Sequence, residues 1–326
     1  MPPSHTVWHD IAALALENET IRVVVVPTMG AKIVSILDKR TGGEWLAGPG
    51  DRPFRPAAYG ATFDQQDMSG WDEMFPTITA CPYPAPGAFT GVPLPDHGEV
   101  WAVPWTRPVT HSDGEGLTLA VEGRALPYRL TRRLSLPGPA TLRFDFHLVN
   151  LGAEPMPYIW AAHPQFCCGV EAQVVLPPDV TQVYNVLTEE WGWGAFNATL
   201  PWPAAQRADG VALELDAIGP PTLKRARKFY VLPDEAVGAA TLVRRPGGDW
   251  LRMAWDAAQV PYLGLWVDEG ALNAASVAAP EPATGFYDSL ALAWQNRRVA
   301  AVQPGTEVTW WLTVQLGTSE EPYEQP

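Results

Sequence analysis

The sequence is poor in several features that mark whole classes of proteins. It contains only 3 Cys among 326 residues, too few and too unevenly placed for a disulfide framework. No apolar run approaches the roughly 20 residues that a membrane-spanning helix needs. The 22 Lys and Arg are outnumbered by 36 Asp and Glu, and a net charge of −14 disfavours nucleic acid and anionic membrane surfaces as partners. We therefore expect no nucleic-acid partner and no membrane association.

Targeting and cofactor motifs are also missing. The first ten residues have neither a cationic start nor an apolar stretch, so no secretory signal is predicted. Together with the low Cys content this favours a reducing, cytoplasmic location. There is no G-x-G-x-x-G after a strand, no P-loop and no G-x-S-x-G elbow, and the His and Cys residues are scattered. We expect neither an organic cofactor nor a metal.

Proline, glycine and tryptophan are abundant instead, with 34, 28 and 15 copies. Proline removes a backbone donor and interrupts helices, so a chain with this much of it is built from many short elements joined by turns. With 47% apolar and only 18% charged residues, the chain has ample material for a large core. An all-helical fold is excluded.

The apolar periodicity is that of β-strands. Residues 141–149 alternate, with Leu142, Phe144, Phe146 and Leu148 on one face. The same alternation recurs over 117–122, 128–136 and 307–316, and the apolar runs 21–26 and 262–267 are typical of strands buried on both faces. No helical crossovers separate these segments, and no low-complexity linker divides the chain. We predict that residues 1–326 form a single all-β domain, a large antiparallel β-sandwich.

Three segments place a titratable group near the end of a predicted strand. His97 lies in a Pro- and Gly-bounded connection, His163 precedes Pro164, and Glu281 stands between two prolines. Connections held by a rigid scaffold are the usual place for functional sites. A structural role is the alternative for each, since a single His is more often a hydrogen-bonded structural residue, and Glu281, like Glu99, would equally be a solvated loop carboxylate.

Taken in order, these segments resemble the galactose mutarotase-like superfamily, which includes the aldose 1-epimerases. The resemblance covers most of the chain, with residues 23–37, the Gly70–Pro76 segment and Trp105 also in the expected places. It implies a β-sandwich of the supersandwich type with a concave sugar cleft. It also implies an isomerase that interconverts the anomers of an aldose, a small carbohydrate, without metal or organic cofactor.

The resemblance also implies roles for individual residues. Anomer exchange needs a base for the proton of the anomeric hydroxyl and an acid for the ring oxygen. By resemblance Glu281 is the base, His163 is the acid, and His97 supports the ring oxygen. Tryptophan rings stack on the C–H face of sugars, and the predicted substrate contacts are Trp71, Asp72, Trp101, Trp105, Lys228 and Asp268.

The sequence departs from the family pattern at three places. Galactose-type members carry a sugar-binding Asp where this chain has Ala226-Arg227-Lys228, and their Asn-Arg pair is replaced by Phe75-Pro76-Thr77. Hexose-6-phosphate members have an Arg where this chain has Trp101. Loss of that cation favours an unphosphorylated sugar, although Arg225, Arg227 and Lys228 leave an anionic group open.

Three functional hypotheses follow from these observations. The first is an aldose 1-epimerase acting on an unphosphorylated sugar. The alternative is a carbohydrate-binding or regulatory protein on the same fold, with catalysis reduced by the missing Asp. A third is a glycoside-processing enzyme that uses two carboxylates, which leaves the paired His residues without a role. The partners of Glu281 would then be Asp72, Glu99, Asp268 or Glu269.

Overall fold

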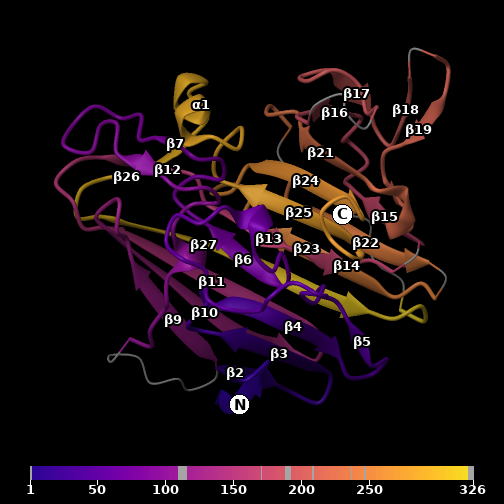
Figure 1. Cartoon of the computed structure of the whole chain (residues 1–326), viewed down its shortest axis with the longest axis horizontal. Helices are drawn as coiled ribbons and strands as arrows, with labels where there is room; N and C mark the ends of the chain where they lie inside the picture. The colour runs from indigo at the N-terminus through magenta and orange to yellow at the C-terminus, as the bar shows by residue number, and fades with distance from the viewer. Residues whose placement is uncertain are drawn as a thin grey trace.

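Two large antiparallel β-sheets make up most of the protein (Figure 1). The computed structural model describes residues 2–108, 116–169, 171–187, 192–207, 209–235, 237–245 and 247–321. Within these ranges every pairing between strands is antiparallel. The α-helix α1 (Leu290–Gln295) is short and lies at one end of the molecule. The predicted all-β antiparallel fold is confirmed.

The first sheet has 13 strands and carries the residues of functional interest. In order across the sheet they are β1 (Ser4–Trp8), β2 (Ile11–Glu17), β3 (Ile21–Val26), β4 (Lys32–Asp38), β6 (Trp71–Met74), β13 (Ala161–Pro164), β25 (Ser276–Ala283), β24 (Tyr262–Glu269), β21 (Arg225–Val231), β16 (Gln182–Asn185) and β17 (Thr199–Pro201). Two short strands join at the side, β5 (Gly43–Glu44) on β4 and β14 (Phe166–Cys167) on β25.

The second sheet has eight strands and supports the first. They are, in order, β20 (Ala217–Ile218), β15 (Glu171–Val175), β22 (Ala239–Arg245), β23 (Trp250–Trp255), β27 (Glu307–Gly317), β11 (Thr141–Asn150), β10 (Tyr128–Gly138) and β9 (Leu117–Glu122). The remaining strands form three two-stranded sheets. These pair β12 (Met156–Tyr158) with β26 (Ala300–Val302), β18 (Ala204–Gln206) with β19 (Ala212–Glu214), and β7 (Cys81–Pro82) with β8 (Pro93–Leu94). The 3-10 helices are η1 (Phe63–Gln65), η2 (Val100–Ala102) and η4 (Pro221–Leu223).

The core lies between the two sheets and draws on both. All six segments predicted as strands are strands, and the alternation in β11 buries Phe144 and Phe146. Phe144 stacks on Trp71 of the first sheet, with ring centroids 4.7 Å apart. Each such buried side chain contributes about 1.5–3 kcal/mol relative to an exposed one. Packing of this kind fixes which face of each strand of the first sheet points away from the second.

A buried ion pair also joins the sheets. Arg132 of β10 reaches Glu73 of β6 with 2.8 Å between Nη1 and Oε1, and both side chains are almost wholly buried. Glu73 also accepts a hydrogen bond from the indole of Trp160, and Arg132 donates to the carbonyl of Ala31. Because every charged atom removed from water needs a partner, these contacts hold β6 in one register over β10.

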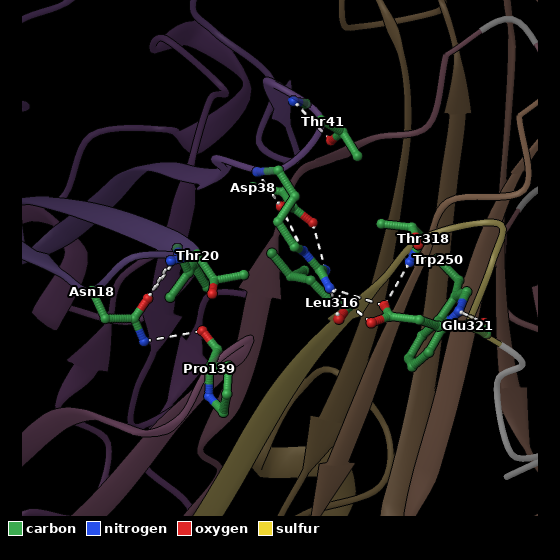
Figure 2. A network of polar contacts seen from close by, with 12 residues as sticks. Asn18, Thr20, Asp38, Thr41, Pro139, Trp250, Leu316, Thr318 and Glu321 are labelled. Carbon is green, nitrogen blue, oxygen red and sulfur yellow. Dashed lines mark hydrogen bonds and ion pairs between the residues drawn. The ribbon is translucent and has the colours of Figure 1, made fainter.

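A more exposed polar network joins the turns at one end of the two sheets (Figure 2). Asn18, in the turn after β2, donates to the carbonyl of Pro139 in the turn after β10. Arg40 donates to Asp38 and to Glu321, and the backbone carbonyl of Glu321 accepts from the indole of Trp250. The Asn18 contact joins the two sheets, and the Arg40 contacts tie the end of β4 to the last described residues of the chain.

Two smaller sequence expectations concern membranes and disulfides. Of the helices in the described ranges, none has both the length and the apolar character to cross a membrane. Cys81, Cys167 and Cys168 all fall within those ranges, and each is a free thiol.

Replacing Arg132 with Met will lower the free energy of unfolding by about 3–5 kcal/mol, because Glu73 is left as a buried charge without its cation. Adding Glu73→Met to this variant will recover much of the loss, since apolar replacements of a buried ion pair are often neutral. The control is Arg129→Met on the same strand, where the pair with Glu122 is exposed and worth about 0–1 kcal/mol. Urea unfolding measures all three, and equal losses for Arg132→Met and Arg129→Met would contradict the assignment.

Candidate functional site

The register of the first sheet aligns a row of polar residues across adjacent strands. Asp72 pairs with His163, and Gly264 pairs with both Glu281 and Tyr230. Because Ala161 faces Ala283 and Phe166 faces Ala278, the same register sets His163 opposite Glu281. The pairing of Ile33 with Trp71 likewise sets Lys32 opposite Asp72. From β4 to β21 the row, called here the polar row, consists of Lys32, Asp72, His163, Glu281, Gly264 and Tyr230.

The polar row points away from the second sheet. Successive side chains of a strand alternate between faces, and Glu73, the neighbour of Asp72, points toward the second sheet, where it meets Arg132. Asp72 and its partners in the register therefore lie on the opposite face. His97 and the 3-10 helix η1 lie over this face, since the ring of Phe63 from η1 contacts His163 with centroids 4.9 Å apart.

His97 reaches the polar row from a tight turn. Its backbone adopts a left-handed conformation with φ of 57°, and its N–H donates to the carbonyl of Ile78. Gly98 follows because a Cβ there would lie 2.1 Å from the carbonyl oxygen of Phe75. Nδ1 of His97 lies 3.0 Å from Asp96, and the imidazole ring stacks on Phe63. These contacts hold the His97 ring 5.2 Å from that of His163.

His163 and Glu281 form the centre of the polar row. Nε2 of His163 lies 3.5 Å from Oε1 of Glu281, and both side chains are buried. Burial lowers the pKa of His163 well below its ordinary value, and electrostatic interactions with His97, Lys228 and Lys32 lower it further. Burial raises the pKa of Glu281, although Lys228 opposes that shift. In the free protein His163 is therefore neutral near pH 7.

Each carboxylate of the polar row is paired with a lysine. On one side Nζ of Lys32 lies 2.8 Å from Asp72 and 2.9 Å from Asp67. Burial raises the pKa of Asp72 to about 6, although Lys32 lowers it. On the other side Nζ of Lys228 lies 2.8 Å from Glu281. His163 thus stands between two buried carboxylate–ammonium pairs.

Polar atoms at the centre of the row have unused hydrogen-bonding capacity. Nδ1 of His163 is buried without a hydrogen-bond partner among the described residues, and the carboxylate oxygens of Asp72 meet only the ammonium group of Lys32. Unpaired buried polar atoms are rare in folded proteins. Beside the row the side chains of Asp96, His97 and Asp288 are 29%, 23% and 25% exposed.

Three residues predicted to bind substrate lie elsewhere, which corrects the sequence interpretation. Trp71 points into the core against Phe144, because it alternates with Asp72. Trp105 is also buried, and its indole donates to the carbonyl of Val100. Asp268 accepts backbone N–H groups from residues 271–273 and thereby closes a turn. Burying an indole removes a large apolar area from water, and for Trp71 and Trp105 this outweighs what stacking on a sugar would contribute.

The other predicted residues divide between the polar row and its surroundings. Asp72 lies in the polar row, and Lys228 contacts it through Glu281. Trp101 lies behind η1, where its ring contacts Phe63 edge-on and its indole donates to the carbonyl of Asp96. It therefore supports the turn that carries His97.

The interpretation of Glu281 and Glu99 as solvated loop carboxylates is wrong, because both side chains are buried. Glu281 lies inside β25, because that strand keeps a full ladder with β24 while Pro280 and Pro282 remove donors from its other side. Glu99 is buried and accepts hydrogen bonds from Tyr59 and Tyr128.

Several residues in and around the polar row were not anticipated. They are Lys32 and Tyr230 within the row, and Phe63, Asp67 and Asp288 beside it. Lys32 had a local signal, since it is a charged residue within an apolar hairpin sequence. Asp288 had none, because its contact with Lys228 depends on how the segment after β25 crosses the sheet.

Asp72 predicts a specific dependence of stability on pH. Its pKa is about 6 in the folded protein against 3.8 ordinarily, so folding favours the protonated form, and this contribution is present at low pH and lost as pH rises through 6. From about pH 4 to about pH 7 the wild type will lose roughly 2 kcal/mol relative to Asp72→Asn. Urea unfolding of both proteins across this range measures the difference, and parallel curves would refute the raised pKa.

Comparison with solved structures identifies the fold. The Slr1438 protein from Synechocystis matches with a TM-score of 0.69 and 17% sequence identity, over 98% of this chain and 98% of that one. A galactose mutarotase-like protein from Lactobacillus casei matches with a TM-score of 0.68 and 17% identity, over 94% of this chain and 100% of that one. A galactose mutarotase related enzyme from Lactobacillus acidophilus matches with a TM-score of 0.65 and 15% identity, over 94% and 98%.

Sequence comparison adds no closer relative. No protein-family model matches the chain, and no curated protein matches it in sequence. At these identities a structural match defines the fold and not the activity. Each match covers at least 94% of both chains, and the chain accordingly has the galactose mutarotase-like fold.

Proposed function

We propose that the protein is an aldose 1-epimerase acting on an unphosphorylated sugar. The observation that carries the proposal is the convergence of three residues far apart in sequence. His163 lies 3.5 Å from Glu281, and the ring of His97 lies 5.2 Å from that of His163. A base and an acid within reach of one small molecule are what pyranose ring opening requires.

The proposed reaction moves two protons. Glu281 accepts the proton of the anomeric hydroxyl, the C1–ring oxygen bond breaks, and the ring oxygen receives a proton from His163. Rotation about C1–C2 and reclosure by the reverse transfers give the other anomer. The raised pKa of Glu281 makes it a stronger base, and the lowered pKa of His163 makes its protonated form a stronger but less populated acid. His97, oriented by Asp96, is placed to donate to the same ring oxygen.

The charges around the site favour an uncharged sugar. The exposed charged groups beside the polar row include the carboxylates of Asp96 and Asp288. The cations below them are engaged, with Lys32 on Asp67 and Asp72, and Lys228 on Glu281 and Asp288. Arg225 and Arg227, which left an anionic group open, both pair with the buried Glu269. A phosphate or uronate would meet carboxylates without a free cation among these groups.

A second function, carbohydrate binding with little catalysis, is favoured by one observation. Lys228 contacts Glu281 directly, at a position where galactose-type sequences differ, and an ammonium partner weakens a carboxylate as a base. The glycoside-processing hypothesis has less support. Of the four partners considered for Glu281, Glu99, Asp268 and Glu269 are engaged in buried structural contacts, and Asp72 lies beyond His163.

Wild-type protein will accelerate the interconversion of α and β anomers of at least one neutral aldose in NMR exchange spectra. His163→Ala and Glu281→Gln will each lower kcat by about 10²–10⁴, the usual contribution of a positioned acid or base. The control is His147→Ala, because His147 is half-exposed on β11 and pairs with Glu307 far from the polar row.

Each alternative has its own outcome in the same experiment. Saturable sugar binding with exchange rates equal to buffer would replace the enzyme hypothesis with the binding hypothesis. Release of a new reducing end from a glycoside would favour the third hypothesis.

A further inference from the structure

Glu281 shares its lysine with a second carboxylate. Nζ of Lys228 lies 2.8 Å from Oε2 of Glu281 and 3.0 Å from Oδ1 of Asp288. That Asp288 oxygen also accepts a hydrogen bond of 2.5 Å from the hydroxyl of Tyr230. One ammonium group therefore compensates two acidic groups, one buried and one partly exposed.

A glycine in the middle strand allows Lys228 to approach Glu281 and Asp288. Gly264 of β24 stands between Glu281 of β25 and Tyr230 of β21 in the polar row. A Cβ at Gly264 would lie 3.3 Å from the Tyr230 ring, tighter than ordinary contact, and 3.4 Å from Oε2 of Glu281. The missing side chain leaves room for Lys228 and Tyr230 to reach across β24 to Glu281 and Asp288. The contacts of Lys228 and Tyr230 therefore depend on the register of the strands and not on the rotamer of one side chain.

The charged and titratable groups around Glu281 come from several elements. Strand β21 provides Lys228 and Tyr230, β13 provides His163, and the segment after β25 provides Asp288. His97 acts on Glu281 electrostatically from the turn before η2. Of these, Lys228 and Asp288 form a direct ion pair through Nζ and Oδ1.

We propose that Lys228 and Asp288 are opposing positioning residues that set the pH range over which Glu281 acts as the base, Lys228 extending it to lower pH and Asp288 restricting it. The proposal deepens the proposed function and rests on it for its kinetic test. Lys228 favours the ionised Glu281, whereas Asp288 draws part of that ammonium charge away and adds a like charge nearby. A carboxylate close to an opposite charge titrates about 1–3 pH units lower, and a nearby like charge acts in reverse.

The test is the pH dependence of kcat/KM for anomer exchange, whose acidic limb reports the base of the free enzyme. In Lys228→Met, Glu281 and Asp288 face each other without a cation, and the limb will move up by about 1 unit or more. In Asp288→Asn, Lys228 serves Glu281 alone, and the limb will move down. Lys228→Arg, which keeps the charge, will return the limb toward the wild-type position.

Opposite shifts of the acidic limb in Lys228→Met and Asp288→Asn distinguish this role from a merely structural one. Loss of packing lowers the rate at every pH and leaves the limb in place. The matched control is Lys39→Met, which removes an exposed lysine paired with Glu17 and will leave the profile unchanged. A limb that stays in place in both Lys228→Met and Asp288→Asn, or moves the same way in both, overturns the proposal. If Lys228→Met does not fold, the downward shift in Asp288→Asn decides alone.

A second measurement does not depend on activity. Carbon-13 NMR titration of protein labelled at the Glu carboxyl carbon, with the Glu281 signal assigned by its loss in Glu281→Gln, follows the same group in the free protein. Shifts of opposite sign in Lys228→Met and Asp288→Asn would support the electrostatic arrangement even if wild type exchanged no anomers, in which case only the proposed function would fail. A Glu281 titration that is unchanged in both variants, in an active enzyme, would overturn the proposal and leave the function intact.

Discussion

The alternation of side chains along antiparallel strands governs everything at this site. Asp72, His163 and Glu281 face the same side only because β6, β13 and β25 pair in one register. A slip of one residue would turn Asp72 into the core and bring Trp71 and Glu73 to the outer face. The Arg132–Glu73 ion pair and the stacking of Trp71 on Phe144 oppose such a slip, since either contact would be lost completely. Contacts within the core thus fix the positions of Asp72, His163 and Glu281, which lie on the face outside the core.

The site lowers the stability of the fold, because several charged groups are buried away from water. An isolated buried carboxylate is strongly unfavourable, and an ion pair recovers that cost only with good geometry. The buried carboxylates on either side of His163 are each paired with a lysine. Asp72 pairs with Lys32, and Glu281 pairs with Lys228. Placing these groups on strands rather than loops limits their motion, as the proposed proton transfers to a small substrate would require.

The sequence predicted the architecture well because period-two alternation is local and strong. The strand over residues 141–149 and the buried run over 262–267 needed no partner to be recognised. The site was only partly predictable. His97, His163 and Glu281 stood out through neighbouring Gly and Pro, but Pro280 and Pro282 also led to a loop being predicted where β25 continues. The tryptophans were misplaced because the facing of Trp71 depends on register, and Asp288 was missed because its partner lies on a distant strand.

The replacement of the galactose-type Asp by the Ala226–Lys228 sequence changes the chemistry more than the fold. A carboxylate at that position would accept hydrogen bonds from sugar hydroxyls, whereas Lys228 is turned onto Glu281 and Asp288. If a sugar binds as proposed, carboxylates beside the polar row can accept its hydroxyl groups, and among the described residues Asp288 and Asp96 are partly exposed carboxylates there. Recognition and proton transfer would therefore be coupled, because a hydroxyl donated to Asp288 weakens its hold on Lys228 and leaves more of that positive charge for Glu281.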